Sequence, residues 1–383
     1  MRIALVHYWL LGSRGGEKVL EGICRIFPEA DIFTLFYDPS AVSPLIRSKN
    51  VRASWLNPMK RFYRSLLPLM PMALEDLDLR GYDLVISSES GPAKGVLTSA
   101  NTSHICYCHS PMRYLWELYP EYRHDYPSGK ISKALLSIFA SRLRLWDYAS
   151  AARVDAFLAN SANTRRRIRR TWRRASRVVY PPVEVEAFRN KPPEGYALVV
   201  AEMVAYKRLD YAVRVFTRSG RRLRVVGVGP EYSSLRRLAG PTVEFCGRVT
   251  DGQLRDLYAR CDALVVPGEE DFGITMVESL ASGKPVIALG RGGAVEIVGG
   301  NCGFLYTEPN EEGLETALRA FDRSGYSIDP GALARRAARF SGAAFNRRFL
   351  SALARSLPPH FSLPGKMSLP GRMDLMPREN AAP

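Results

Sequence analysis

Cysteine is scarce in this sequence, at six residues in 383, and its six positions are widely scattered. No two of them form a CxxC pair, so neither the common zinc-binding spacings nor a disulfide framework is indicated. We therefore expect reduced, buried thiols, as in a cytoplasmic protein. Cys106 and Cys108 stand two apart in an expected strand and should face the same side of it.

Long hydrophobic runs are also missing, although 46% of the residues are hydrophobic. No run approaches the roughly 20 apolar residues that a membrane-spanning helix needs. Residues 1–8 have the pattern of a buried strand and lack the cleavage site of a signal peptide, so we do not expect export.

Negative charge is in short supply, because 38 acidic residues stand against 54 basic ones, a net charge of +16. An anionic membrane, an anionic substrate or nucleic acid would suit this balance. Nucleic acid is the least favoured, since no recognition motif accompanies the charge. The arginine-rich residues 165–174 are either a solvated helix face or a membrane-facing patch. Residues 55–72 mix aromatic, apolar and cationic side chains, which suits a membrane surface or an ordinary packed loop.

Strand-like and helix-like stretches alternate along the chain, which predicts an α/β fold. The expected strands are residues 3–7, 31–35, 84–87, 104–107, 156–159, 196–201, 222–228, 243–245, 263–266 and 285–289. The expected helices are residues 17–26, 133–149, 210–217, 233–238, 251–260, 275–281, 294–297, 314–321 and 331–355.

A proline pair, Pro181-Pro182, follows the first alternation and favours an extended linker. A chain of 383 residues is too long for one ordinary core. We therefore predict two domains, 1–181 and 182–356. Residues 357–383 are rich in proline, glycine and methionine, and we predict a poorly ordered tail there.

Two glutamates, Glu270 and Glu278, give the strongest functional signal. The first follows the expected strand 263–266 and the second lies in the expected helix after it. Ligands of open α/β sheets bind at the carboxyl ends of strands, and helix N-termini favour phosphate. Carboxylates accept hydrogen bonds from hydroxyl groups. The pair therefore predicts a ligand with sugar or ribose hydroxyls beside a phosphate.

Further motifs follow other expected strands. Gly15 and Gly16, in residues 11–18, allow close approach of a ligand to the backbone, although this turn is neither GxGxxG nor a Walker loop. His109 lies among aromatic and arginine side chains that suit a sugar and an anion. Lys207 and Arg208 would neutralise a diphosphate. The glycine-rich residues 226–231 and 290–296 are either structural turns or nucleotide contacts.

Taken together, these residues resemble the retaining GT-B glycosyltransferases of family 4, over nearly the whole chain to about Arg355. The most specific part is Glu270-Asp-Phe-Gly-Ile-Thr-Met-Val-Glu278, which is similar to the E-x7-E motif of that family. Residues 14–20 and 106–114 look like a bacterial branch described as mannosyltransferases of polysaccharide or glycolipid assembly.

The resemblance implies two Rossmann-like domains facing a cleft, with the acceptor on the first, the nucleotide sugar on the second, and a final helix that crosses back. It implies that Glu270 contacts the donor sugar, Glu278 the ribose, and His109 lies near the reacting sugar. The remaining donor contacts that it implies are Gly15, Gly16, Lys207, Arg208, Gly273, Ile274, Gly292 and Gly293.

One position departs from the family pattern. Many members carry an arginine ahead of the lysine, whereas this chain has Glu202 there. An anion near the donor phosphates should weaken their binding, and Arg208 is a candidate to compensate. Asp76-Leu-Asp78 imitates a metal-binding DxD but precedes a strand, so we expect a solvated turn and no required metal or cofactor.

We therefore expect a metal-independent, retaining transfer of a hexose, mannose from GDP-mannose, to a lipid-linked saccharide or glycolipid. The protein should work in the cytoplasm, on the inner face of the membrane, and without nucleic acid. Two other hypotheses are an epimerase that acts on a nucleotide sugar and a non-catalytic nucleotide-sugar-binding subunit. Glu202 is the feature that keeps the second of these open.

Overall fold

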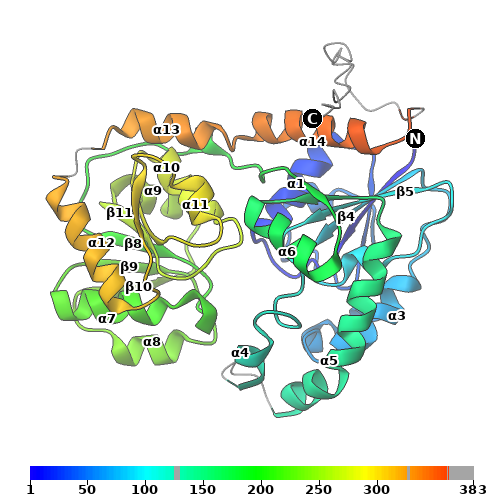
Figure 1. The fold of residues 1–383 in the computed structure, drawn as a ribbon, viewed down its shortest axis with the longest axis horizontal. Helices are drawn as coiled ribbons and strands as arrows, with labels where there is room; N and C mark the ends of the chain where they lie inside the picture. The colour runs from blue at the N-terminus through cyan, green and yellow to red at the C-terminus, as the bar shows by residue number, and fades with distance from the viewer. Residues whose placement is uncertain (125–129, 326–327, 360, 362–383) are drawn as a thin grey trace, which may run out of the picture.

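The computed structural model describes residues 1–124, 130–325, 328–359 and 361. It divides into two α/β units side by side, with α13 and α14 running along one side of both (Figure 1). Each unit is a parallel sheet with helices packed against it. The predicted α/β class with two Rossmann-like domains is therefore confirmed.

Among the described residues, the first unit holds a seven-stranded sheet in the order β3-β2-β1-β4-β5-β6-β7, and all its pairings are parallel. Its strands are β1 (Ile3–His7), β2 (Asp31–Thr34), β3 (Val51–Ala53), β4 (Leu84–Glu89), β5 (Ser103–Cys108), β6 (Ala156–Ala159) and β7 (Ser176–Val178). Its helices are α1 (Gly15–Ile26), α2 (Pro44–Arg47), α3 (Met70–Glu75), α4 (Tyr119–His124), α5 (Lys130–Ser150) and α6 (Ala162–Trp172). Its 3-10 turns are η1 (Asn57–Phe62), η2 (Leu67–Leu69), η3 (Ala93–Gly95) and η4 (Ala151–Arg153).

The second unit holds, within the described ranges, a six-stranded parallel sheet in the order β10-β9-β8-β11-β12-β13. Its strands are β8 (Ala197–Val200), β9 (Leu223–Val226), β10 (Val243–Gly247), β11 (Ala263–Val266), β12 (Val286–Leu289) and β13 (Gly303–Tyr306). Its helices are α7 (Leu209–Ser219), α8 (Tyr232–Leu238), α9 (Asp251–Arg260), α10 (Ile274–Ala281), α11 (Ala294–Ile297), α12 (Glu311–Arg323) and α13 (Pro330–Ala338). The 3-10 turns η5 (Val185–Ala187) and η6 (Ala205–Lys207) belong to the same part of the chain.

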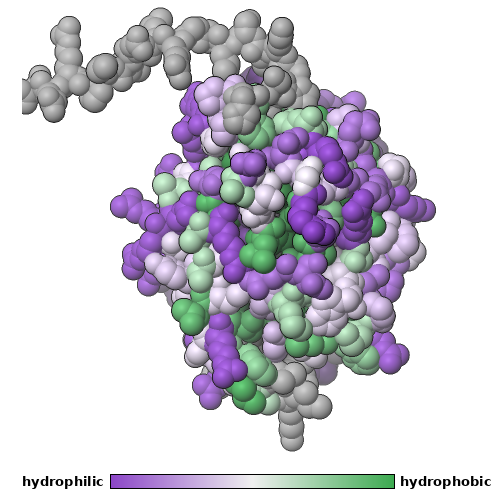
Figure 2. Space-filling view, turned by 90° about the vertical axis from the view of Figure 1, so that its right-hand side faces the viewer, coloured by the Kyte–Doolittle hydropathy of each residue, from purple (hydrophilic) through white to green (hydrophobic). Residues whose placement is uncertain are grey.

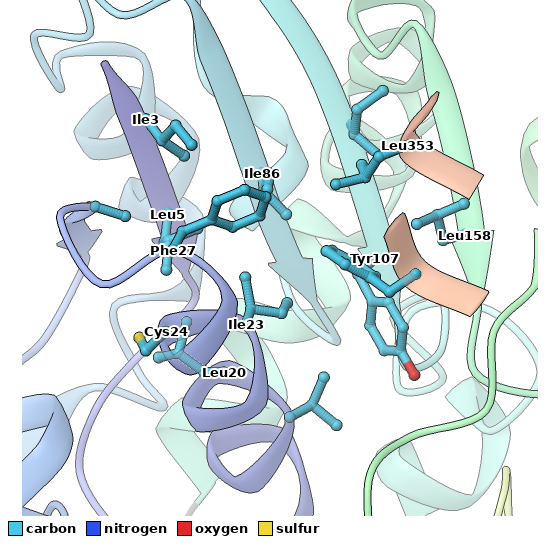
Figure 3. Close-up of a cluster of buried hydrophobic side chains, with 14 of the residues drawn as sticks. Ile3, Leu5, Leu20, Ile23, Cys24, Phe27, Ile86, Tyr107, Leu158 and Leu353 are labelled. Carbon is cyan, nitrogen blue, oxygen red and sulfur yellow. The ribbon is translucent and has the colours of Figure 1, made fainter. Parts of the chain in front are cut away.

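The core of the first unit shows why these segments fold as they do. All five residues of β1 are buried, as expected for a parallel strand covered on both faces. In α1 the buried side chains Val19, Leu20, Ile23 and Cys24 form one apolar stripe that faces the sheet. These side chains pack with Ile86 and other sheet residues in a single cluster (Figure 3).

The last helix of the described chain, α14 (Gly342–Ser356), packs on the first unit although α13 packs on the second. Phe345, Phe349 and Leu353 of α14 enter the same core cluster as α1, and Figure 3 shows Leu353 near Tyr107 and Leu158. The chain therefore crosses between the units twice, first near residues 181–182 and again between α13 and α14.

Every strand predicted from the sequence is present, to within a few residues. The sequence did not indicate β3, β7 or β13, which have three or four residues and are not fully buried. The expected helix 331–355 is two helices, because the chain at Phe340–Ser341 leaves the helix to pair with Val183. The side chains of Cys106 and Cys108 lie in one buried cluster, as expected. The predicted tail, 357–383, falls almost wholly outside the described residues.

Candidate functional site

The topology places the candidate residues at the switch point of each sheet. In the second sheet β8 and β11 are neighbours, and from them the strand order runs outward in opposite directions. Ligands of open α/β sheets bind at the carboxyl ends of such strands. The segment after β8 carries Lys207, and the segment after β11 carries Glu270. In the first sheet β1 and β4 hold the same position, and the glycine-rich turn follows β1.

Lys207 and Glu270 meet in this structure. The Lys207 Nζ donates to Glu270 Oε1 at 2.7 Å, so the two predicted site residues form one ion pair. Burial alone would lower the pKa of Lys207, but the Glu270 carboxylate outweighs it and the pKa is raised. The lysine therefore stays cationic at every physiological pH.

Glycines hold the Glu270 loop in place. Gly293 N–H donates to the Glu270 carbonyl at 2.8 Å. A Cβ on Gly292 would lie 2.2 Å from that same carbonyl oxygen, and one on Gly293 would lie 2.0 Å from the Phe272 carbonyl oxygen. No side chain fits at either position, so the turn after β12 packs directly on the loop that carries Glu270. Gly273, at φ +94, then turns the chain into α10.

The glycine-rich turn of the first unit packs against the second unit. A Cβ on Gly15 would lie 2.9 Å from Ile274 Cδ1, at the start of α10. A Cβ on Gly16 would lie 2.6 Å from the Tyr8 hydroxyl. The structure thus brings together Gly15 and Ile274, two residues that the sequence assigned to one ligand from opposite domains.

Glu278 is buried, at 3% exposed, and accepts hydrogen bonds from residues of both units. The Tyr258 hydroxyl donates to Glu278 Oε2 at 3.0 Å, and Lys18 Nζ of α1 donates to Glu278 Oε1 at 3.2 Å. The sequence analysis did not identify Lys18. Its position beside the glycine-rich turn was the available signal.

Glu202 has an ion-pair partner that the sequence analysis also missed. Arg14 Nη1, in the glycine-rich turn, lies 3.4 Å from Glu202 Oε2 across the two units. Arg208 makes a forked ion pair with Asp210 at 3.1 and 3.2 Å, and its guanidinium lies 3.8 Å from the Tyr211 ring centroid. The cation next to Glu202 is therefore Arg14, whereas Arg208 is engaged elsewhere.

His109 follows directly after β5 in the first unit. Its Nε2 is 2.9 Å from Ser88 Oγ, and Thr164 Oγ1 donates to the His109 carbonyl at 3.1 Å. Burial, with a smaller contribution from His7, lowers the pKa of His109 to about 3. The imidazole is therefore neutral at physiological pH and able to accept or donate a hydrogen bond.

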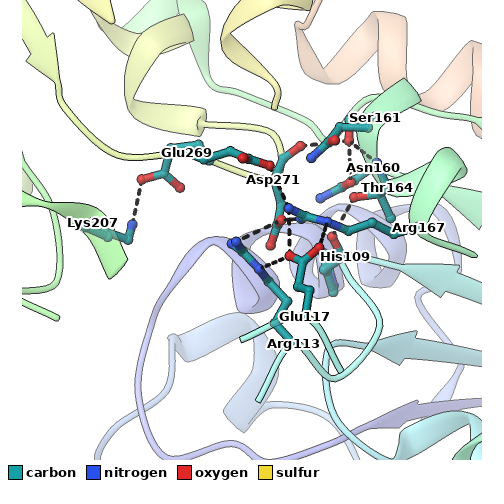
Figure 4. A network of polar contacts seen from close by, with 12 residues as sticks. His109, Arg113, Glu117, Asn160, Ser161, Thr164, Arg167, Lys207, Glu269 and Asp271 are labelled. Atoms are coloured by element: carbon teal, nitrogen blue, oxygen red, sulfur yellow. Dashed lines mark hydrogen bonds and ion pairs between the residues drawn. The ribbon is translucent and has the colours of Figure 1, made fainter. Parts of the chain in front are cut away.

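Arginines of the first unit form ion pairs with the neighbours of Glu270 in its loop (Figure 4). Arg167 of α6 pairs with Glu269 at 2.7 Å and with Asp271. Arg113 lies 3.4 Å from Asp271 and 2.7 Å from Glu117. The arginine-rich stretch is thus neither wholly solvated nor wholly turned to a membrane, because Arg167 binds the neighbouring unit.

The N-terminus of α6 is occupied by a carboxylate of the second unit. Glu296 accepts from the backbone N–H groups of Ala162 and Asn163 at 2.8 and 3.0 Å, and from the Tyr180 hydroxyl at 3.1 Å. A carboxylate at a helix N-terminus is stabilised by the free N–H groups and the helix dipole. The contact fixes α6 relative to α11.

A cavity of about 640 Å³ opens beside this junction. It is lined mainly by loops and helices of the second unit, with Arg113, Leu118 and Glu121 of the first unit on its border. Tyr206, Arg208, Glu231, Ser234, Gly268 and Arg291 are among its lining residues. A volume of this order is typical of a small-molecule site.

No group of three His, Cys, Asp or Glu residues able to hold a metal ion occurs in the part of the chain that the structure describes. Asp78, of the DxD-like sequence, is exposed and pairs with Arg80 at 2.7 Å. Among the same described residues, no helix is long and apolar enough to cross a membrane.

Two family models match the chain in succession. Residues 14–187 match "Glycosyltransferase Family 4", and residues 194–321 match "Glycosyl transferases group 1". The chain belongs to the GT-B glycosyltransferases of family 4. The first match includes the strands of the first sheet from β2 to β7 together with Gly15 and Gly16, and the second includes the whole second sheet and the E-x7-E segment.

The names of the relatives of this chain state several different transferase activities. The sulfoquinovosyl transferase of Arabidopsis thaliana is 29% identical over 203 residues, which are 50% of this chain and 36% of the relative. The GDP-mannose-dependent alpha-mannosyltransferase of Mycolicibacterium smegmatis is 34% identical over 113 residues, which are 29% of this chain and 30% of the relative. The chain thus matches about a third of the length of these two relatives.

Solved GT-B structures match over almost the full length of the chain. The Anabaena protein HepE in complex with UDP-glucose has a TM-score of 0.68 at 16% identity, covering 93% of this chain and 100% of that one. The lipopolysaccharide outer core galactosyltransferase WaaB has a TM-score of 0.66 at 16% identity, with the same coverage. At this level of identity the likeness establishes the fold.

Proposed function

We propose that this chain transfers a hexose from a nucleotide-diphosphate sugar to a lipid-linked saccharide or glycolipid acceptor. The observation that carries the proposal is the Lys207–Glu270 pair, held by glycine turns at the carboxyl edge of the second sheet. A cation for phosphate and a carboxylate for hydroxyls stand side by side there, which is the complement of a sugar diphosphate.

The donor that we propose is GDP-mannose. Support comes from three mycobacterial relatives that are named as GDP-mannose-dependent mannosyltransferases, at 30–34% identity. Bound donor would compete with Lys207 for Glu270, so that the ammonium turns to the diphosphate and the carboxylate to the sugar hydroxyls. Glu278 would accept from the ribose hydroxyls in the same way.

Arg14 completes the proposed phosphate site. It stands across from Lys207 on the other unit, and its partner Glu202 is partly exposed. A diphosphate carries more charge than one carboxylate, so it should displace Glu202 from Arg14. Arg14 would then supply, from the first unit, the cation that the family commonly has at position 202. This arrangement favours an active enzyme over a non-catalytic subunit.

The proposed reaction retains the configuration at the sugar's anomeric carbon. The bond from that carbon to the diphosphate oxygen breaks, and the acceptor oxygen bonds to the carbon on the same face. The acceptor's proton passes to the leaving diphosphate, so no side-chain nucleophile or metal is needed. Lys207 and Arg14 stabilise the charge that develops on the leaving group, and neutral His109 hydrogen-bonds the sugar.

Titration calorimetry with GDP-mannose, UDP-glucose and GDP-glucose tests the donor. We expect GDP-mannose to bind, and slow hydrolysis to release GDP and mannose without an acceptor. The proposal fails if no nucleotide sugar is bound, hydrolysed or transferred. Release of a different GDP-hexose instead would identify an epimerase.

We also propose that the first unit docks on an anionic membrane, through a surface formed by η1, η2 and α3 with the adjoining α5. Trp55, Phe62 and Met72 are exposed there, and Arg61 lies over the Phe62 ring at 4.5 Å. Helix α5 packs against η2 and exposes Leu145. Figure 2, which faces this side, shows apolar side chains beside hydrophilic ones in its lower half. Such a mixture suits an anionic lipid surface.

Co-sedimentation with phosphatidylglycerol vesicles at low salt tests this surface. We expect Trp55→Ser with Phe62→Ser to reduce binding strongly. Val295→Ser with Leu305→Ser removes exposed apolar residues of the second unit and serves as the control. Equal binding by both double variants would contradict the proposal.

A further inference from the structure

A second cavity lies wholly within the first unit and is lined by arginine. Its volume is about 680 Å³, and all its lining residues fall between Pro111 and Arg173. Arg113, Arg144, Arg167, Arg170 and Arg173 face it, against one carboxylate, Glu117. We call these residues the arginine pocket. Carboxylates pair with Arg113 and Arg167, and an anion that enters the pocket would supply counter-charge to the other arginines.

Three of the five arginines are held in place by the protein. Arg113 and Arg167 both pair with Glu117, at 2.7 and 2.8 Å. Arg144 Nε donates to the Leu115 carbonyl at 2.6 Å, and its guanidinium lies 4.3 Å from the Tyr119 ring centroid. These guanidinium groups are therefore positioned before any ligand arrives, which lowers the entropy cost of binding.

The other two arginines have no such engagement. Within the described ranges, neither Arg170 nor Arg173 pairs with a carboxylate, and both are exposed at the pocket. Arg173 ends α6 at φ 56, a conformation that non-glycine residues rarely adopt. Two free guanidinium groups beside three fixed ones make a site for a group with several anionic oxygens.

An aromatic wall completes the pocket. Trp116 lines it, and the indole Nε1 donates to Asp147 Oδ2 at 2.7 Å. Trp172 donates to the same oxygen at 2.8 Å, and Lys94 binds the other oxygen of Asp147. Asp147 therefore fixes the Trp116 ring, which offers an apolar face beside the arginines.

The arginine pocket adjoins the proposed donor site. Arg113 lines both this pocket and the 640 Å³ cavity of the second unit. Arg167 reaches from the pocket to Glu269, the neighbour of Glu270 (Figure 4). A ligand anchored in the pocket would thus lie next to the segment that holds the donor sugar, on the side of the first unit.

We infer that the arginine pocket binds a phosphate or diphosphate group of the acceptor. This inference rests on the proposed function, because it assigns the acceptor's anionic group to the unit opposite the donor. The group belongs either to a prenyl diphosphate or to a phospholipid headgroup, since both present several phosphate oxygens to guanidinium donors.

The test uses the full chain and three soluble probes in titration calorimetry. Geranyl diphosphate represents the prenyl diphosphate, dihexanoyl phosphatidylinositol the phospholipid headgroup, and geraniol is the uncharged control. The variant is Arg170→Gln with Arg173→Gln. The matched control is Arg165→Gln with Arg169→Gln, which removes two exposed arginines of α6 that do not line the pocket.

We expect at least one phosphate probe to bind and geraniol not to bind. Binding should be about tenfold or more weaker in the pocket variant, because the variant loses charge-assisted hydrogen bonds from two guanidinium groups. The control variant should bind like the unchanged chain. The stronger of the two phosphate probes identifies the source. The inference is overturned if neither phosphate probe binds, or if both variants weaken binding equally.

GDP-mannose, titrated into the same preparations, separates this inference from the proposed function. The pocket variant should bind GDP-mannose like the unchanged chain, which also shows that it is folded. Phosphate binding that depends on Arg170 and Arg173, without any binding of a nucleotide sugar, would sink the proposed function and leave the pocket standing. Normal GDP-mannose binding without such phosphate binding would overturn the inference about the pocket and leave the proposed function standing.

Discussion

The two domains present opposite chemistry to each other. The second domain offers carboxylates, Glu270 and Glu278, each already paired with a lysine. The first domain offers the arginine pocket and a neutral histidine, His109. Carboxylates in such pairs can exchange a lysine for ligand hydroxyls, whereas guanidinium groups select anions. The difference supports our proposal that one domain recognises a polyhydroxylated donor and the other an anionic acceptor.

The interiors of the domains differ as well. The first domain buries an ion pair, Lys94 with Asp147, and the Lys94 ammonium lies 4.4 Å from the Trp172 ring centroid. Glu89 lies beside this pair, and burial raises the pKa of Glu89 to about 8. The second domain buries the carboxylate Glu278, but its cationic partner, Lys18, belongs to the first domain and is about half exposed. The first domain's charged interior is what positions α5, α6 and Trp116 around the arginine pocket.

The largest effect should come from breaking that buried pair. Asp147→Asn leaves Lys94 charged and without its main counter-charge in a fully buried place. We expect the free energy of unfolding to fall by about 3–5 kcal/mol, measured by urea denaturation. Asp256→Asn, which breaks an exposed pair with Lys191 in the second domain, should cost at most about 1 kcal/mol. Equal losses would show that the two interiors do not differ in this respect.

Removing the charge of Glu270 should weaken the proposed donor site of the second domain. Glu270→Gln keeps the size of the side chain but loses the acceptor charge and the pair with Lys207. We expect kcat/KM for GDP-mannose to fall about 10- to 100-fold, the cost of one charged hydrogen bond, with the melting temperature little changed. Glu244→Gln, at an exposed pair with Arg224, is the control. Full activity of Glu270→Gln would remove that residue from the site.

The neutral histidine should make the first domain sensitive to acid. An unfolded histidine takes up its proton near pH 6.5, whereas native His109 does so only near pH 3. Stability is therefore complete above about pH 6.5 and is lost as the pH falls toward 3. From pH 7 to pH 5 we expect His109 to account for a loss of about 1–2 kcal/mol.

Denaturation of the unchanged chain and of His109→Gln at both pH values measures this contribution. The variant should lose less stability on acidification, by that amount. If both chains lose the same stability, His109 titrates like an exposed histidine. The first domain would then not hold a permanently neutral imidazole opposite the carboxylates of the second domain.

The smallest effect concerns the pair that joins the domains, Arg14 with Glu202. Both side chains are partly exposed, so the pair itself is worth about 1 kcal/mol or less. Glu202→Gln should strengthen GDP-mannose binding about two- to fivefold, because Arg14 is released toward the diphosphate. Arg14→Gln should weaken it by a similar factor. Calorimetry on both single variants and the double variant checks this, and stronger binding by Arg14→Gln would refute the role of Arg14.

Much of this molecule follows from the sequence. Alternating apolar and amphipathic runs determined the two parallel sheets, because strand and helix periodicity are local properties. The glycine-rich residues 290–296 left a structural turn and a nucleotide contact equally open, and it is the structure that shows Gly292 and Gly293 against the loop that carries Glu270. The placement of Glu270 and Glu278 at the carboxyl edge of the second sheet needed only the order strand, loop, helix.

Tertiary structure alone decided the partners across the cleft. Lys18 and Glu278 are 260 residues apart and Arg14 and Glu202 are 188 apart, so no local pattern could connect them. The arginine-rich stretch looked uniform in sequence, yet Arg167 and Arg170, three positions apart on α6, both line the pocket, whereas Arg165 and Arg169 do not. Side chains on successive helix positions point in different directions, and which of those directions meets a cavity depends on how the domains pack.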